Sequence, residues 1–115
     1  MTPTVDQAST MLDVLADIEN DPGSWSQRFY RMAGGSCFAG KTALRVGGKW
    51  KRPVERNDPF MIHPVTGHEV HCRTLAREYL GLDQLDAVML FRSTNTLNDL
   101  RRLVEKHIDA ALENA

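Results

Sequence analysis

The chain has no long hydrophobic run. None of its apolar stretches approaches the roughly 20 residues that a membrane-spanning helix needs. Its first ten residues, MTPTVDQAST, also lack the basic and apolar regions of a secretory signal peptide. We therefore expect a cytoplasmic protein that has no membrane partner.

Cysteine is scarce as well. The 115 residues contain only Cys37 and Cys72, too few for the disulfide framework that holds small secreted domains together. In a reducing compartment, each is expected to be a small buried hydrophobic residue. A chain of this length can bury a sufficient core without covalent staples, so residues 1–115 are predicted to form a single domain.

Basic residues are missing from the start of the chain. Residues 1–21 hold five acids and no Lys or Arg, whereas residues 28–56 hold eight Lys or Arg and one acid. The net charge of the whole chain is nevertheless only −1. The basic segment either binds an anionic partner or lies beside the acidic first helix and is neutralised there. The second explanation is favoured, because near-balanced totals usually reflect internal compensation or mixed surfaces.

The most regular apolar pattern lies in residues 71–112 and predicts three successive helices. The last begins after Thr96, with Asp99 three residues later as in a capping box, and runs to about Leu112. Its apolar residues recur at spacings of three and four: Leu97, Leu100, Leu103, Val104, Ile108, Ala111 and Leu112. This spacing places one face of the helix in the core.

Two shorter helices precede it. Residues 74–80 are followed by Gly81, which suits the left-handed conformation that ends many helices. Asp83 then opens the next helix, with Leu82 placed to fold back on it as a hydrophobic staple. Connections this short force the three helices to pack as neighbours.

A first helix is predicted near the start of the chain. Thr4 and Gln7 can form a capping box, and Pro22 stops the helix soon after Glu19. The apolar residues that follow the cap have helical spacing: Val5, Ala8, Met11, Leu12, Leu15 and Ile18. This spacing is typical of an amphipathic helix.

Residues 24–35 have no sustained period and are predicted to form an aromatic-anchored loop with one helical turn at most. Trp25 and Phe29 are expected to cover the open end of the helical core. An exposed aromatic ligand site is the alternative. A further helix is predicted to begin at Cys37, with Ser36 as its cap.

A short β-hairpin is predicted near residues 60–71, because two short apolar or β-prone stretches flank the turn residues of 64–67. The fold class expected is therefore mainly α. It is a compact bundle of about five helices with this one hairpin.

Residues 35–42 contain the spacing Gly-x-x-x-x-Gly-Lys-Thr of a phosphate-binding loop. That loop works between a buried strand and a helix of a βαβ unit, where its backbone amides surround phosphates. No apolar strand precedes Gly35 here. We interpret the match as a helix start that resembles the motif by chance, and expect no cofactor.

Potential metal ligands gather around the hairpin: His63, His68, His71 and Cys72. Their spacing matches no zinc signature, and alternate residues of a strand point to opposite faces. Exposed or hydrogen-bonded histidines are the favoured interpretation, with a zinc site as the alternative. Cysteine and histidine could also form a nucleophilic pair, but only composition suggests it, so we expect no catalytic residue and no enzyme.

Two sets of residues are candidates for contacts with a partner. Lys49, Lys51, Arg52 and Arg56 lie in a charged stretch broken by prolines, which is typical of a surface connection and could meet an anionic partner. The two tryptophans, Trp25 and Trp50, could supply aromatic contacts.

A set of helix caps, apolar positions and one tryptophan is spread over roughly residues 10–108: Trp25, then Cys37-Phe38-Ala39-Gly40, Ala76, Leu80-Gly81-Leu82, Leu90-Phe91, Asn95-Thr96-Leu97 and Asp99-Leu100. In these positions the chain resembles a loosely defined set of small uncharacterised helical proteins of actinobacteria and actinobacteriophages. The resemblance implies a compact helical domain in bacterial or phage-infected cytoplasm, and no activity. The basic connection 49–56 departs from the set.

Two functions are consistent with these features. The first is a small non-enzymatic accessory protein that binds another protein, such as a phage protein acting on a host protein or on itself. The second is a small helix-turn-helix-like DNA-binding regulator, suggested by the successive short helices and the basic middle segment. Protein interaction is favoured, because Asp99 at the start of the candidate recognition helix would repel DNA phosphates.

Overall fold

The computed structural model describes residues 2–32, 35–52 and 57–115. Within these ranges the protein is mainly helical and carries two small antiparallel sheets. The helices are α1 (Val5–Asn20), the short 3-10 helix η1 (Pro22–Ser24), α2 (Phe38–Arg45), α3 (Cys72–Leu80), α4 (Gln84–Phe91) and α5 (Leu97–Glu113). The strands are β1 (Arg31–Met32), β2 (Gly35–Ser36), β3 (Lys49–Trp50), β4 (Phe60–Ile62) and β5 (Glu69–His71).

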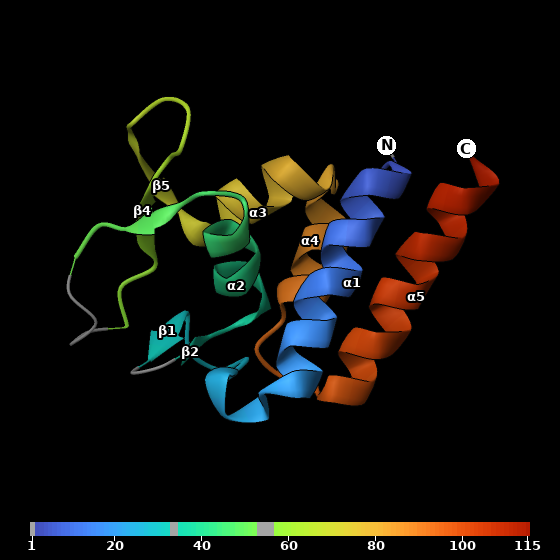
Figure 1. Cartoon of the computed structure of the whole chain (residues 1–115), viewed down its shortest axis with the longest axis horizontal. Helices are drawn as coiled ribbons and strands as arrows, with labels where there is room; N and C mark the ends of the chain where they lie inside the picture. Colours follow the sequence, from blue (N-terminus) through green and yellow to red (C-terminus); the bar gives the residue numbers. More distant parts are fainter. Residues whose placement is uncertain (1, 33–34, 53–56) are drawn as a thin grey trace.

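The long helices α1 and α5 lie side by side at one end of the molecule, and the strands β4 and β5 lie at the other end, with α2 and α3 between them (Figure 1). Each helix in the described part of the chain is too short or too polar to cross a lipid bilayer. The main core lies where all five α-helices meet, and includes Met11, Phe38, Leu80, Leu90 and Leu100.

A smaller apolar cluster joins the sheet to the helices. Met61 of β4 is fully buried with Ala43, Cys72 and Leu75. Tyr30 packs against both this cluster and the main core. The two clusters therefore form one folded unit across the described residues.

The prediction of a single hairpin was too simple. The hairpin itself is present, since Met61 of β4 pairs with Val70 of β5. However, Trp50 of β3 pairs with Met61 as a third strand, where the sequence predicted a surface connection. The half-buried Trp50 packs against the smaller cluster, and this packing outweighs the charges that surround it in the sequence.

Local signals placed most helix ends correctly. Thr4 and Thr96 both form complete capping boxes, and the Asp83 side chain caps α4. Gly81 ends α3 with a left-handed φ of 65°. These confirmed positions all depend on contacts between residues three or four apart, which the sequence shows directly.

Two helix starts were misplaced. The cap of α2 is Cys37 rather than Ser36, because the Cys37 Sγ accepts the Gly40 N–H at 3.4 Å. Helix α3 begins at Cys72, two residues before the predicted start, because the Nδ1 atom of His71 accepts the Arg73 N–H at 3.1 Å and caps the helix directly after β5. A thiol and an imidazole here perform the role usually filled by hydroxyl and carboxylate side chains.

The loop after α1 is held by an amide side chain. Gln27 is buried. Its Oε1 atom accepts two hydrogen bonds, one from the indole N–H of Trp25 at 3.0 Å and one from the backbone N–H of Phe38 at 3.1 Å. Its Nε2 atom donates to the backbone carbonyls of Leu90 and Arg92, each at 3.2 Å. These bonds connect the loop to α2 and α4. Trp25 packs against the main core as predicted.

The prediction for the other aromatic side chain of this loop was wrong. Phe29 is 48% exposed and does not cover the core. The neighbouring Tyr30 is the aromatic side chain that packs against the core, where it contacts both apolar clusters.

Candidate functional site

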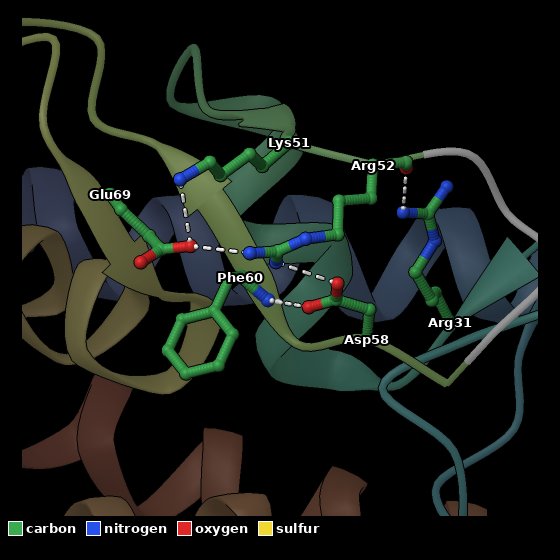
Figure 2. A network of polar contacts seen from close by, with 6 residues as sticks. All are labelled: Arg31, Lys51, Arg52, Asp58, Phe60 and Glu69. Atoms are coloured by element: carbon green, nitrogen blue, oxygen red, sulfur yellow. Dashed lines mark hydrogen bonds and ion pairs between the residues drawn. The ribbon is translucent and has the colours of Figure 1, made fainter.

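The predicted basic surface contains its own counterions. Lys51 Nζ lies 3.0 Å from Glu69 Oε1, while Arg52 contacts Asp58 Oδ2 at 2.8 Å and Glu69 Oε1 at 3.2 Å (Figure 2). Lys49 is exposed on β3, and Arg56 lies outside the described residues. Two of the four predicted cations therefore already bind carboxylates.

The carboxylates of this network are held in their charged form. The pKa of Glu69 lies below its ordinary value, chiefly because Lys51 donates a hydrogen bond to it. The pKa of Asp58 is also lowered, first by the backbone N–H of Phe60 and then by Arg52 (Figure 2). Both acids stay ionised at neutral pH, so the compensation of Lys51 and Arg52 persists there.

The acidic first helix neutralises another cation of the middle segment. Arg45 of α2 lies 2.8 Å from Asp17 and 3.5 Å from Asp13, both on α1. Ion pairs between the neighbouring helices α1 and α2 thus neutralise part of the charge asymmetry of the sequence.

A pocket of about 600 Å³ opens between β1, β2, α2 and β3. Its cations are Arg31, Lys41 and Arg45, and its acid is Asp17. Its full lining is Asp17, Arg31, Met32, Gly35, Ser36, Lys41, Leu44, Arg45 and Trp50. The pocket is therefore cationic on balance and has apolar walls.

Two buried polar atoms of residues that line this pocket lack hydrogen-bond partners among the described residues. Arg31 and Ser36 are buried, yet Arg31 Nε and Ser36 Oγ have no hydrogen-bond partner within residues 2–32, 35–52 and 57–115. The Arg31 guanidinium also lies over the Trp50 ring, 4.6 Å from its centroid. The sequence did not single out Arg31, because nothing local distinguishes it from the other basic residues.

The two tryptophans do not form one aromatic site. Trp50 lines the cationic pocket, whereas Trp25 lines a separate depression with Ser93, Thr94 and Asn95. Each therefore has its own packing role.

The phosphate-loop spacing has a structural explanation. The Phe38 N–H already bonds to Gln27 and the Gly40 N–H to Cys37, so these amides are engaged at the start of α2. A Cβ on Gly40 would lie 2.8 Å from the carbonyl oxygen of Tyr30, so the loop and helix approach closely here. Close packing requires this glycine.

The four residues considered as potential metal ligands do not converge. His63 accepts the N–H groups of Val65 and Thr66 at Nδ1, so its Nε2 carries the proton and donates to Glu78 at 3.2 Å. His71 caps α3, and burial lowers its pKa. In the part of the chain that the structure describes, no three His, Cys, Asp or Glu side chains could share a metal ion.

The two cysteines are buried, as predicted, and they form a pair. The Cys72 thiol donates a hydrogen bond to Cys37, which lowers the pKa of Cys37 to about 7 against the opposing effect of burial. The same hydrogen bond and burial raise the pKa of Cys72. Cys37 is therefore the more acidic thiol of the pair.

An apolar groove of about 120 Å³ runs between α1 and α5. Its rim includes Val5, Leu12 and Leu112, whose exposed fractions are 43%, 49% and 59%. The sequence placed these residues at helical spacing among the apolar positions of the two helices. They lie at the edge of each apolar stripe, where two paired helices leave a shallow gap.

A second apolar stripe lies on α4. Leu85, Val88 and Met89 are exposed on successive turns of this helix. None of them lines the α1/α5 groove.

The chain was compared with known proteins, and no family model, curated protein or solved structure matches it.

Proposed function

We propose that this protein is a non-enzymatic interaction module that receives an amphipathic helix of another protein in the α1/α5 groove. The observation that carries the proposal is the row of half-exposed aliphatic side chains along this groove, Val5, Leu12 and Leu112. An amphipathic helix that lies in such a groove buries apolar residues on both sides of the contact.

The charges around the groove indicate what kind of helix would bind. Residues 2–12 and 107–115 contain Asp6, Asp109 and Glu113, and no Lys or Arg. A partner helix with Lys or Arg beside its apolar face would be attracted to this end of the molecule, and an acidic one would be repelled. We therefore expect a basic amphipathic helix.

Contacts of the basic segment favour this function over DNA binding. A DNA-binding surface neutralises phosphates with available cations, but Lys51 and Arg52 are engaged with Asp58 and Glu69. Asp99 is fixed in the capping box of α5, close to where a recognition helix would meet DNA. The resemblance to actinobacterial and phage proteins suggests a host protein as the partner.

Affinity capture from an actinobacterial lysate treated with nuclease tests the proposal. The wild-type protein should retain one dominant protein through a basic helix, and Leu12→Glu should reduce its recovery by about tenfold or more. Leu85→Glu is the matched control, because it adds the same charge at an exposed leucine of α4. Circular dichroism should show that both variants remain folded.

Two results would contradict the proposal. Equal recovery by the Leu12 and Leu85 variants would exclude the groove as the binding surface. Recovery that disappears after nuclease treatment would support the DNA-binding alternative.

A further inference from the structure

The cationic pocket holds hydrogen-bond donors that lack acceptors. Arg31 is 7% exposed and Ser36 is 1% exposed, and Arg31 Nε and Ser36 Oγ, both buried, have no partner among the described residues. Both residues line the same pocket, from neighbouring strands β1 and β2. Buried polar groups are rarely left without a partner, so two of them in one pocket point to a ligand that accepts hydrogen bonds.

The orientation of Arg31 is fixed before any ligand arrives. Its Nη1 donates to the carbonyl oxygen of Arg52 at 2.6 Å (Figure 2), and its guanidinium lies over the Trp50 ring. These contacts use one nitrogen and one face of the group and leave the Nε edge unpaired. Such preorganisation reduces the entropy lost on binding, and the edge of a guanidinium suits an oxyanion.

The charge of the pocket selects an anion. Lys41 Nζ donates to the neutral Ser24 Oγ at 2.8 Å, and within the described residues neither Arg31 nor Lys41 forms an ion pair with a carboxylate. The Asp17 carboxylate also lines the pocket but is bound by Arg45. Asp58 acts on Arg31 only through space, without direct contact. Two positive charges thus remain for a ligand.

The size and walls of the pocket indicate more than an inorganic ion. A volume of about 600 Å³ lies within the range of small-molecule sites. Met32, Leu44 and Trp50 supply apolar wall beside the cations. A dianionic head group with an apolar or aromatic body matches this combination.

We propose that this pocket binds a phosphate monoester, with Arg31 and Lys41 contacting the phosphate, Ser36 donating a hydrogen bond and Trp50 lying beside the organic body. The site differs from a phosphate-binding loop, because the amides of Phe38 and Gly40 are already engaged and side chains provide the contacts. It is also separate from the α1/α5 groove, so it goes beyond the function proposed above and does not depend on it.

Calorimetric titration of the full chain at low salt tests this site, with phenyl phosphate as the probe. We expect saturable binding of one equivalent, with inorganic phosphate and phenol each bound about fivefold more weakly or worse. Lys41→Gln should weaken the binding of phenyl phosphate by about tenfold, because it removes one of the two available cations. Ser36→Ala should weaken binding by about threefold, through one lost hydrogen bond.

The matched control is Lys49→Gln. It removes the same charge from the exposed residue next to Trp50, outside the pocket lining, and should change the affinity by less than about twofold. Lys41 is only partly buried, so its replacement should leave the protein folded, as the far-ultraviolet circular dichroism can verify.

Three outcomes would overturn the proposal. The first is that the folded wild-type protein shows no saturable binding of phenyl phosphate up to about 10 mM. The second is equal weakening by Lys41→Gln and Lys49→Gln, which would mean attraction to general surface charge. The third is that phenol binds as well as phenyl phosphate, which would mean an apolar site without a phosphate contact.

Discussion

Two polar junctions hold distant parts of this protein together, and they differ in their access to water. Gln27 is 6% exposed and joins the loop after α1 to α2 and to the end of α4 through three hydrogen bonds. The Arg52 side chain is 47% exposed and joins the segment that follows β3 to Asp58 and Glu69 through ion pairs. The surface junction carries full charges, and the buried one carries only dipoles.

The comparison shows why the number of contacts is a poor guide to stability. If Arg52 loses a partner, water can replace it, and the free energy of unfolding changes little. If Gln27 is lost, the buried Phe38 N–H loses its acceptor and water reaches it poorly, so the full cost of burying an unpaired group appears. The neutral junction should therefore matter more to the fold than the charged one.

Replacement of Gln27 should have the largest effect. Gln27→Leu keeps a similar volume but leaves the Phe38 N–H without an acceptor, and we expect the free energy of unfolding to fall by about 3 kcal/mol. Urea unfolding followed by circular dichroism measures this change. Gln84→Leu on the exposed start of α4 is the matched control, expected to change stability by less than about 0.5 kcal/mol. Equal losses in the two variants would refute the role of the buried junction.

The cysteine pair should give an intermediate effect that depends on pH. The pKa of Cys37 is lowered to about 7 in the folded protein, below its value in an unfolded chain, so unfolding takes up protons between these two values. The free energy of unfolding should therefore rise by roughly 1 to 2 kcal/mol from about pH 7 to pH 9. Above that range it should fall again, because the raised pKa of Cys72 keeps a thiol protonated that ionises in the unfolded chain.

Urea unfolding at a series of pH values, for the wild type and for Cys72→Ala, measures the contribution of the pair. The variant should lose most of the rise, because Cys37 no longer receives the hydrogen bond that lowers its pKa. If the free energy of unfolding of Cys72→Ala depends on pH as it does in the wild type, titratable groups other than the cysteine pair cause the rise.

Replacement of Arg52 should have the smallest effect. Arg52→Gln removes the exposed ion pairs to Asp58 and Glu69, and we expect the smallest loss of stability among these variants, because water replaces the lost partners. The difference from wild type should shrink further at about 1 M salt, where exposed charges are screened. A salt-independent loss larger than that of Gln27→Leu would reverse the comparison between the two junctions.

The sequence predicted those parts of the fold that depend on near neighbours in the chain. The capping boxes at Thr4 and Thr96 and the left-handed Gly81 were correct, since each involves residues at most four positions apart. The strand at Trp50 was missed, because two residues show no alternation and its partner Met61 is eleven positions away. Gln27 was missed for the same reason, since its bond to Leu90 spans 63 positions.

The candidate sites were harder to predict than the fold. Sequence alone could count the cations of the middle segment but could not separate Arg52, which binds carboxylates, from Arg31, which lies buried in a pocket. Periodicity placed Leu12 and Leu112 on apolar stripes without showing that these residues lie at the open edge of the helix pair. Both distinctions depend on which elements become neighbours in three dimensions.

The pairing of α1 with α5 also determines when the core can close during synthesis. Helix α1 precedes the first residue of α5 by 77 positions, and Glu19 of α1 bonds to Arg101 of α5 across 82 positions. At a translation rate of 5 to 20 residues per second, α1 waits roughly 4 to 15 s for its partner. During that interval Met11 and Val14, both fully buried in the finished protein, lack the α5 side of their core. The order of synthesis therefore leaves the apolar face of α1 exposed to water until α5 has been made.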